Sequence, residues 1–269
     1  MVRKLLKQEI IYYYRKLCIF IPIVFAFGLF VRLFVAICGD NTIGKIIVGL
    51  SYTTLAIACI GLIFLSAILG IVRFYKNMYS SEGYLTLTLP VKHSEHILVK
   101  LIGSTAAELI CLLVVIVTII FSIPTELLGE FFLRVKMLLH SQTTFSGANG
   151  VLFVIEMLIL LVVEVASGRL LIYACITVGQ LAKRNRVLMA VVAYFVYYVA
   201  SQIVSTIVAV ISTLASFTGL FDNISAWLDN NTVLALHLTS IGGLLLSAAL
   251  GAAYWFVTQY IMSKKLNLE

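Results

Sequence analysis

The sequence predicts an all-α integral membrane protein with six transmembrane helices. Of its 269 residues, 62% are hydrophobic and only 12% are charged, with a mean hydropathy of +1.09. A water-soluble domain carries about twice that charged fraction. A helix needs about 20 apolar residues to cross a bilayer. Runs of that length occupy 17–38, 46–73, 97–123, 150–182, 186–215 and 234–262, so we expect a single transmembrane domain over 1–269.

The basic residues fall mainly on one side of these runs. Fourteen belong to one alternating set of connecting segments and termini, and three to the other set, which holds only Lys45, Arg134 and Lys136. Because positive charge is enriched in cytoplasmic segments, this distribution predicts that both termini are cytoplasmic. An even number of spans agrees with that orientation.

Two segments outside the spans have an amphipathic pattern. Residues 1–16 place apolar side chains at helical spacing, with Arg3, Lys4 and Lys7 on the other side. Residues 125–140 repeat the pattern, and Pro124 suits the first turn of a helix there. We expect a cytoplasmic interfacial helix over 1–16 and an outer amphipathic helix over 125–140.

The long cytoplasmic connection over 74–96 is unusually rich in aromatic and aliphatic residues. It begins FYKNMYSSEGYLTLTLPV. A loop that only reversed the chain would be shorter and more polar. Exposed apolar side chains indicate an interaction surface. The alternative interpretation is a loop folded back onto the helix ends, and the residues alone leave both open.

This run, together with the C-terminal tail over 264–269, resembles bacterial ABC-2-type permeases, particularly small stand-alone ones. The resemblance implies a type V exporter-like arrangement, with a coupling helix between spans 2 and 3 that sits in a groove of a separate ATPase subunit. It assigns that contact to Glu82, Gly83, Tyr84, Leu85, Thr86, Thr88, Leu89 and Pro90.

The same resemblance implies the assembly and its role. Two permease subunits, as a homo- or heterodimer, would act with two ATPase subunits in the bacterial cell membrane. The cargo would be an amphipathic peptide, an antibiotic or a lipid-like molecule, moved by export.

We do not expect the chain to be an enzyme. Residues 39–45 read GDNTIGK and fit the first seven positions of a phosphate-binding loop, but Ile46 stands where a Ser or Thr must bind Mg²⁺. ATP and Mg²⁺ are therefore expected on the partner ATPase. The HSEH run over 93–96 has no third ligand nearby, so we expect no metal site. We interpret the five scattered cysteines as packing thiols.

Five charged residues lie well inside the predicted spans, away from the span ends. Burying a charge in lipid is costly, so such residues should face the bundle interior and find partners. At a rise of about 1.5 Å per residue, Glu108 and Arg169 lie roughly 16 and 20 Å from the cytoplasmic ends of their spans, so we expect them to pair. A similar depth argument pairs Arg32 with Glu164. The full set is Arg32, Glu108, Glu156, Glu164 and Arg169.

These charges allow two interpretations, a polar translocation path or structural contacts between helices, and for an ATP-driven exporter we favour the second. The path interpretation defines the alternative function, an ion-coupled secondary transporter or channel. That class predicts inverted repeats and helices broken near mid-membrane, and the sequence has no clear repeat between 1–123 and 124–269. A membrane anchor that recruits a soluble partner is a third possibility.

The last span carries small residues at a spacing that permits close helix approach. Either another span of this chain or a second subunit would fit against them. The residues are Gly242, Gly243, Ser247, Gly251 and Ala252.

Overall fold

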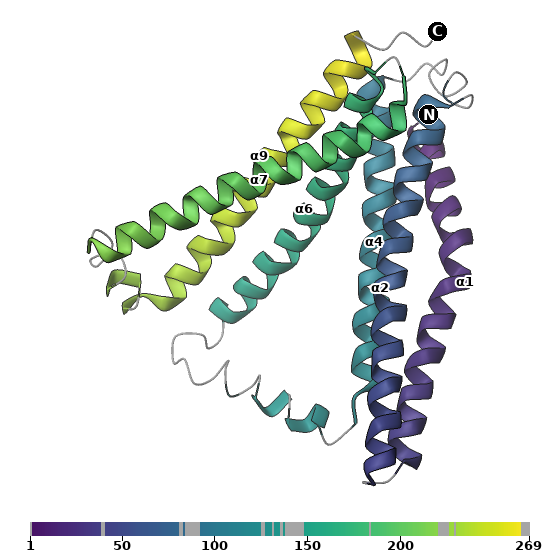
Figure 1. Ribbon diagram of the computed structural model, residues 1–269, viewed down its shortest axis with the longest axis vertical. Coiled ribbons are helices and arrows are strands. Elements are labelled where there is room, and N and C mark those ends of the chain that lie inside the picture. Colours follow the sequence, from purple (N-terminus) through teal and green to yellow (C-terminus); the bar gives the residue numbers. More distant parts are fainter. Residues whose placement is uncertain are drawn as a thin grey trace. The chain divides into compact units, whose positions relative to one another are not determined.

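Six long helices make up the fold (Figure 1). The computed structural model describes residues 2–38, 41–80, 83, 92–124, 127–130, 132–134, 137, 148–182, 184–219, 226–228 and 230–264. The long helices are α1 (Val2–Ile37), α2 (Thr42–Tyr79), α4 (His93–Ser122), α6 (Ala148–Gly179), α7 (Arg186–Phe217) and α9 (Thr232–Lys264). All six are long and apolar enough to cross a membrane. The predicted all-helical, multi-pass membrane protein with six spans is therefore confirmed.

The chain divides into two compact units, 1–141 and 142–269. The first unit contains α1, α2 and α4, and the second contains α6, α7 and α9. Each unit is described by itself below.

The N-terminal segment of the first unit does not form the separate amphipathic helix that the sequence predicts. Residues 2–16 do not form a separate helix but continue into the span as one 36-residue helix, α1. No helix-breaking residue occurs before Pro22, and one buried stripe runs through Tyr13, Leu17 and Val24. The location of residues 1–16 at a membrane surface stays a prediction.

The connection expected over 74–96 is shorter in the structure. Helix α2 continues six residues past the predicted end at 73, because nothing in that stretch interrupts a helix and Phe74, Asn77 and Met78 are buried. Helix α4 begins at His93, four residues before the predicted span. In the expected outer helix, the described stretches 127–130 and 132–134 are helical, and most of its other residues lie outside the described part of the chain.

The core of the first unit is formed where α1 packs against α2 and α4. The helices approach closely because small residues lie at the crossings. A Cβ added at Gly28 would lie 2.6 Å from Thr118 Cγ2 and 3.0 Å from Ser122 Oγ. Buried members of this core include Tyr13, Leu17, Val31, Leu55, Leu62, Cys111 and Val115.

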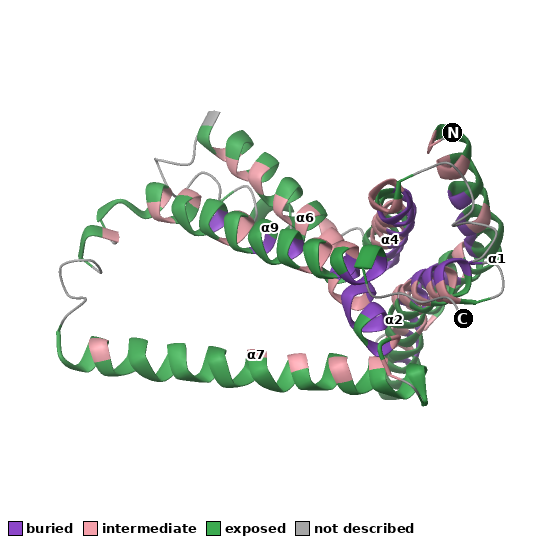
Figure 2. Ribbon diagram, turned by 90° about the horizontal axis from the view of Figure 1, so that it is seen from above, coloured by how far each residue is buried: buried purple, intermediate pink, exposed green. Residues whose placement is uncertain are grey.

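In the second unit, α6 packs along α9, and α7 contacts α6. Asn185 lies in the turn between α6 and α7 and has φ 58°, a left-handed conformation that Asn tolerates. The backbone of Gly179 meets Ala190 so closely that an added Cβ would lie 2.6 Å from the Ala190 nitrogen. None of the residues of α7 is buried, and Figure 2 draws this helix green and pink along its whole length.

Candidate functional sites in the two units

Gly83 of the predicted coupling segment lies against the end of α2. Of its eight predicted residues, only Gly83 belongs to the described part of the chain; Glu82, Tyr84, Leu85, Thr86, Thr88, Leu89 and Pro90 lie outside it. The Gly83 N–H donates to the Ser80 carbonyl at 2.7 Å. A Cβ on Gly83 would lie 2.7 Å from the Met78 carbonyl oxygen. Glycine is therefore required for this close approach, and the start of the segment is held on the last turn of α2.

A charged cluster lies in the first unit near the C-terminal end of α2. It consists of Glu9 of α1, Arg73 of α2 and Lys100 of α4, and we call it the Glu9 cluster. Arg73 Nε donates to both Glu9 carboxylate oxygens, at 3.3 and 3.2 Å, and its Nη2 lies 3.2 Å from Oε1. Lys100 Nζ forms an ion pair with the same Oε1. One carboxylate therefore connects all three helices of the unit.

The surroundings of the Glu9 cluster exclude most solvent. Glu9 is 4% exposed and Lys100 is 5% exposed. The guanidinium of Arg73 lies over the Tyr12 ring, 4.3 Å from its centroid, a cation–π contact. A Cβ on Gly103 would lie 3.1 Å from Glu9 Cβ, so a glycine at this position lets α1 approach α4 closely enough for the ion pair to form.

Glu9 is not among the predicted site residues. Arg73 and Lys100 belong to the fourteen basic residues whose distribution predicts the orientation. A signal was present, because Glu9 precedes Tyr13 and Leu17 at intervals of four and shares their face of the helix. An acidic residue on the apolar face of a helix, among many basic neighbours, indicates a buried ion pair.

At the far end of the first unit, polar groups complete the C-terminus of α4. The last carbonyls of a helix have no partner within the helix and carry partial negative charge. Arg32 of α1 donates to the Phe121 carbonyl at 3.1 Å, with its guanidinium 4.7 Å from the centre of the Phe121 ring. Tyr52 of α2 donates to the Ser122 carbonyl at 3.2 Å. The intramembrane charge of Arg32 thus has a structural role.

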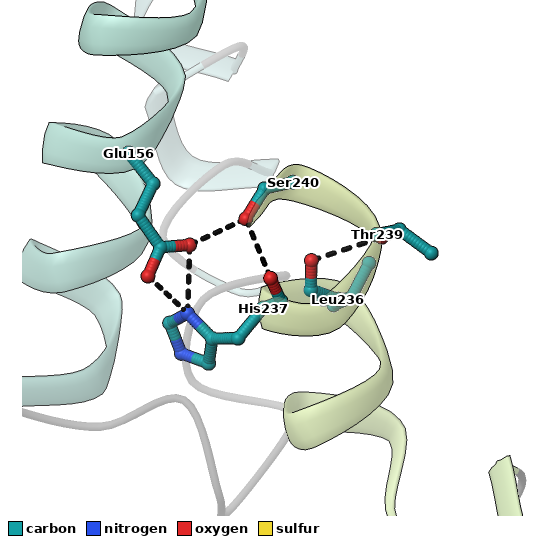
Figure 3. Close-up of polar contacts among 5 residues, drawn as sticks. All are labelled: Glu156, Leu236, His237, Thr239 and Ser240. Atoms are coloured by element: carbon teal, nitrogen blue, oxygen red, sulfur yellow. Dashed lines mark hydrogen bonds and ion pairs between the residues drawn. The ribbon is translucent and has the colours of Figure 1, made fainter. Parts of the chain in front are cut away.

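In the second unit, Glu156 of α6 contacts two side chains of α9 (Figure 3). His237 Nδ1 lies 2.9 Å from both carboxylate oxygens. Ser240 Oγ donates to Oε2 at 2.5 Å. The side chains of Glu156 and His237 are 24% and 20% exposed. His237 and Glu156 are 81 residues apart in the sequence, and only the folded chain brings them together.

A second carboxylate lies further along the same helix pair. Ser247 Oγ donates to Glu164 at 2.5 Å. Glu164 follows Glu156 by eight residues, about 12 Å along the helix. Their hydrogen bonds, which go to different α9 side chains, do not connect the two carboxylates.

Three of the five small residues of the last span lie against residues of α6. Ser247 binds Glu164, Gly251 faces Ser167, and Gly243 faces Leu160, all on α6. A Cβ added at Gly251 would lie 3.3 Å from Ser167 Cβ. The close approach is therefore made with another span of the same chain. Gly242 has open space around it, and Ala252 is exposed.

The pairings predicted for the remaining intramembrane charges each join residues of different units. Glu108 belongs to the first unit, and Arg169, only 2% exposed, belongs to the second. Arg32 and Glu164 are divided in the same way. Both pairings stay predictions. Within the described residues, no group of three or more His, Cys, Asp or Glu side chains is arranged to hold a metal ion.

The fold and these contacts define the class of protein, a multi-pass helical membrane protein. Comparisons of the chain with protein family models, with curated proteins and with solved structures found no match.

Proposed function

We propose that this chain is the transmembrane permease subunit of an ATP-binding cassette exporter that uses a separate ATPase subunit. One observation carries the proposal. The segment that resembles an ABC-2 coupling loop connects α2 to α4, and these two helices are joined to α1 near their connected ends by the Glu9 cluster. A segment that receives force from a soluble partner can transmit it only if the helices that it connects are held firmly to their neighbours.

In this proposal the helices act through their cytoplasmic ends. ATP and Mg²⁺ bind on the ATPase pair, whose closure displaces the loop over 81–91. The displacement passes into α2 and α4 and changes access at the interface of two permease subunits. An amphipathic peptide, an antibiotic or a lipid-like molecule, as the resemblance implies, would then leave the bacterial cell membrane.

The test is capture of the ATPase from detergent-solubilised membranes. We expect an ATPase subunit to co-purify with the wild-type chain and to be lost from Tyr84→Ala/Leu85→Ala. The matched control is Tyr198→Ala/Leu188→Ala, which changes the same residue types at exposed positions of α7. A folded wild-type chain that captures no ATPase, or a loop variant that captures as much as the control, would count against the proposal.

A second candidate, an ion-coupled transporter or channel, is favoured by the partly exposed Glu156–His237 pair. In that case a proton gradient alone should drive transport in proteoliposomes, and Glu156→Gln should abolish it. The separation of Glu156 and Glu164 by about 12 Å weighs against a continuous relay through these two carboxylates.

A further inference from the structure

We infer that Glu9 is a positioning residue for the loop over 81–91, because it makes α1 move together with α2 and α4. The inference rests on the proposed function for the source of the movement. The connection itself belongs to the first unit and can be tested without a partner.

The chain topology explains why such a connection is needed. The loop is covalently joined only to α2 and α4. Helix α1 is joined to α2 at the opposite end, where Ile37 is followed after a short connection by Thr42. Within the described residues, side-chain contacts therefore attach α1 to its neighbours at the loop end, and Glu9 supplies ion pairs there.

Tightly packed side chains lie between the Glu9 cluster and the ends of α2 and α4 that the loop connects. Arg73 precedes Ser80 by seven residues and Lys100 follows Lys92 by eight, which is about 10 and 12 Å along the helices. Within this layer, Phe74, Met78 and Ile97 are fully buried. Because protein interiors are nearly incompressible, a displacement at the loop reaches the level of Glu9 with little loss.

The ionic character of the cluster fixes the position of α1. Arg73 approaches Glu9 through two nitrogens and Lys100 through a third, from two different helices. A carboxylate held in this way has one favourable position, whereas an apolar side chain at the same site would tolerate sliding. Sliding or rotation of α1 would leave buried charges without their partner.

Hydrogen–deuterium exchange on the purified chain tests the connection. In Glu9→Gln we expect backbone amides of residues 2–12 to exchange faster by roughly tenfold, because local opening no longer breaks an ion pair. Lys16→Gln, which changes an exposed charge on the same helix, should leave this exchange at the wild-type level. Unchanged exchange in Glu9→Gln would overturn the inference.

The second measurement uses the complex with its ATPase. Adding ATP and Mg²⁺ should change exchange in α1, α2 and α4 together in the wild type. In Glu9→Gln, capture of the ATPase should persist while the change disappears from α1. A change in α1 that persists in the variant would overturn the inference. Failure of the wild type to capture an ATPase would contradict the proposed function alone, since the first measurement needs no partner.

A charge-reversed pair covers the case in which Glu9→Gln does not fold. Glu9→Lys/Lys100→Glu, made together with Arg73→Leu so that no guanidinium faces the new lysine, exchanges the charges of α1 and α4 and keeps an ion pair between them. Recovery of folding and of slow α1 exchange, relative to Glu9→Lys alone, supports the inference. Absence of recovery overturns it.

Discussion

The two units hold their helices together in different ways. In the first unit, charged and polar groups join all three helices at both ends, through the Glu9 cluster and through Arg32 and Tyr52 at the end of α4. In the second unit, carboxylate–hydroxyl bonds join α6 to α9, while α7 has no buried residue. Tyr197 of α7 does bond Tyr254 of α9.

The difference indicates that the first unit behaves as one body, and that the second is a hydrogen-bonded helix pair whose third helix, α7, contacts α6 but buries none of its residues. Charges that connect three helices resist relative movement of each of them. Hydrogen bonds between two membrane helices are weaker, about 0.6 kcal/mol on average. Under the proposed function, this assigns transmission of force to the first unit and leaves more freedom to the second.

The largest effect should come from overpacking the first unit at its closest crossing. Gly28→Leu would drive side-chain atoms into Thr118 and Ser122, and we expect a loss of about 3 kcal/mol of stability. The thermal midpoint in one detergent measures it. Gly61→Leu is the matched control, since nothing lies within 4 Å of a Cβ there. Equal midpoints for the two variants would mean that this crossing is not tightly packed.

Removing one cation from the Glu9 cluster should lower the free energy of unfolding by about 2 kcal/mol. In Lys100→Met the buried carboxylate loses its α4 partner but keeps Arg73, so the loss is partial. The same thermal assay reports it beside Lys16→Met, an exposed position that should change little. A stability equal to that of the control would contradict the three-helix connection.

A smaller effect is expected in the second unit. Ser247→Ala removes the hydroxyl that binds Glu164, and we expect a loss of about 1 kcal/mol. Ser212→Ala is matched to it, because the Ser212 hydroxyl donates only to the Ala209 carbonyl of its own helix. If the two serine variants have the same thermal midpoint, the hydrogen bond between Ser247 of α9 and Glu164 of α6 contributes nothing measurable to stability.

The smallest effect should come from Arg32→Leu. Arg32 is exposed and places a positive charge at the C-terminal end of α4, an interaction worth about 0.5 kcal/mol. Arg32→Lys should recover part of the loss, since the charge is kept while the planar contact with Phe121 is lost. The thermal midpoint measures the loss of stability. A larger loss in Arg32→Leu than in Ser247→Ala would indicate a further role for this charge.

Much of the fold could be predicted from the sequence because membrane spans are determined by composition over a long window. All six apolar runs correspond to helices. The boundary of α2 was missed because Lys76 and Asn77 were interpreted as loop residues. Asn77 is instead buried, and a helix passes through such residues when its neighbours cover them.

The sites were harder to predict because their residues come from different helices. Spacing along one helix shows which residues share a face, but it does not identify the residue across the interface. Glu9 therefore could not be matched with Arg73 and Lys100, nor Glu156 with His237. The resemblance over 82–90 supplied the functional hypothesis, and for all but Gly83 of its residues that hypothesis stays a prediction.

The most direct test applies one chemical change to both units. Glu9→Gln and Glu164→Gln each replace a carboxylate with an amide of nearly equal size. We expect Glu9→Gln to lower stability by about 3 kcal/mol, because the buried Lys100 and the half-buried Arg73 both lose their anion. Glu164→Gln should leave the thermal midpoint unchanged or raise it, since the amide oxygen still accepts from Ser247 and carries no charge. Equal losses in the two variants, or a larger loss in Glu164→Gln, would contradict the distinction between the units.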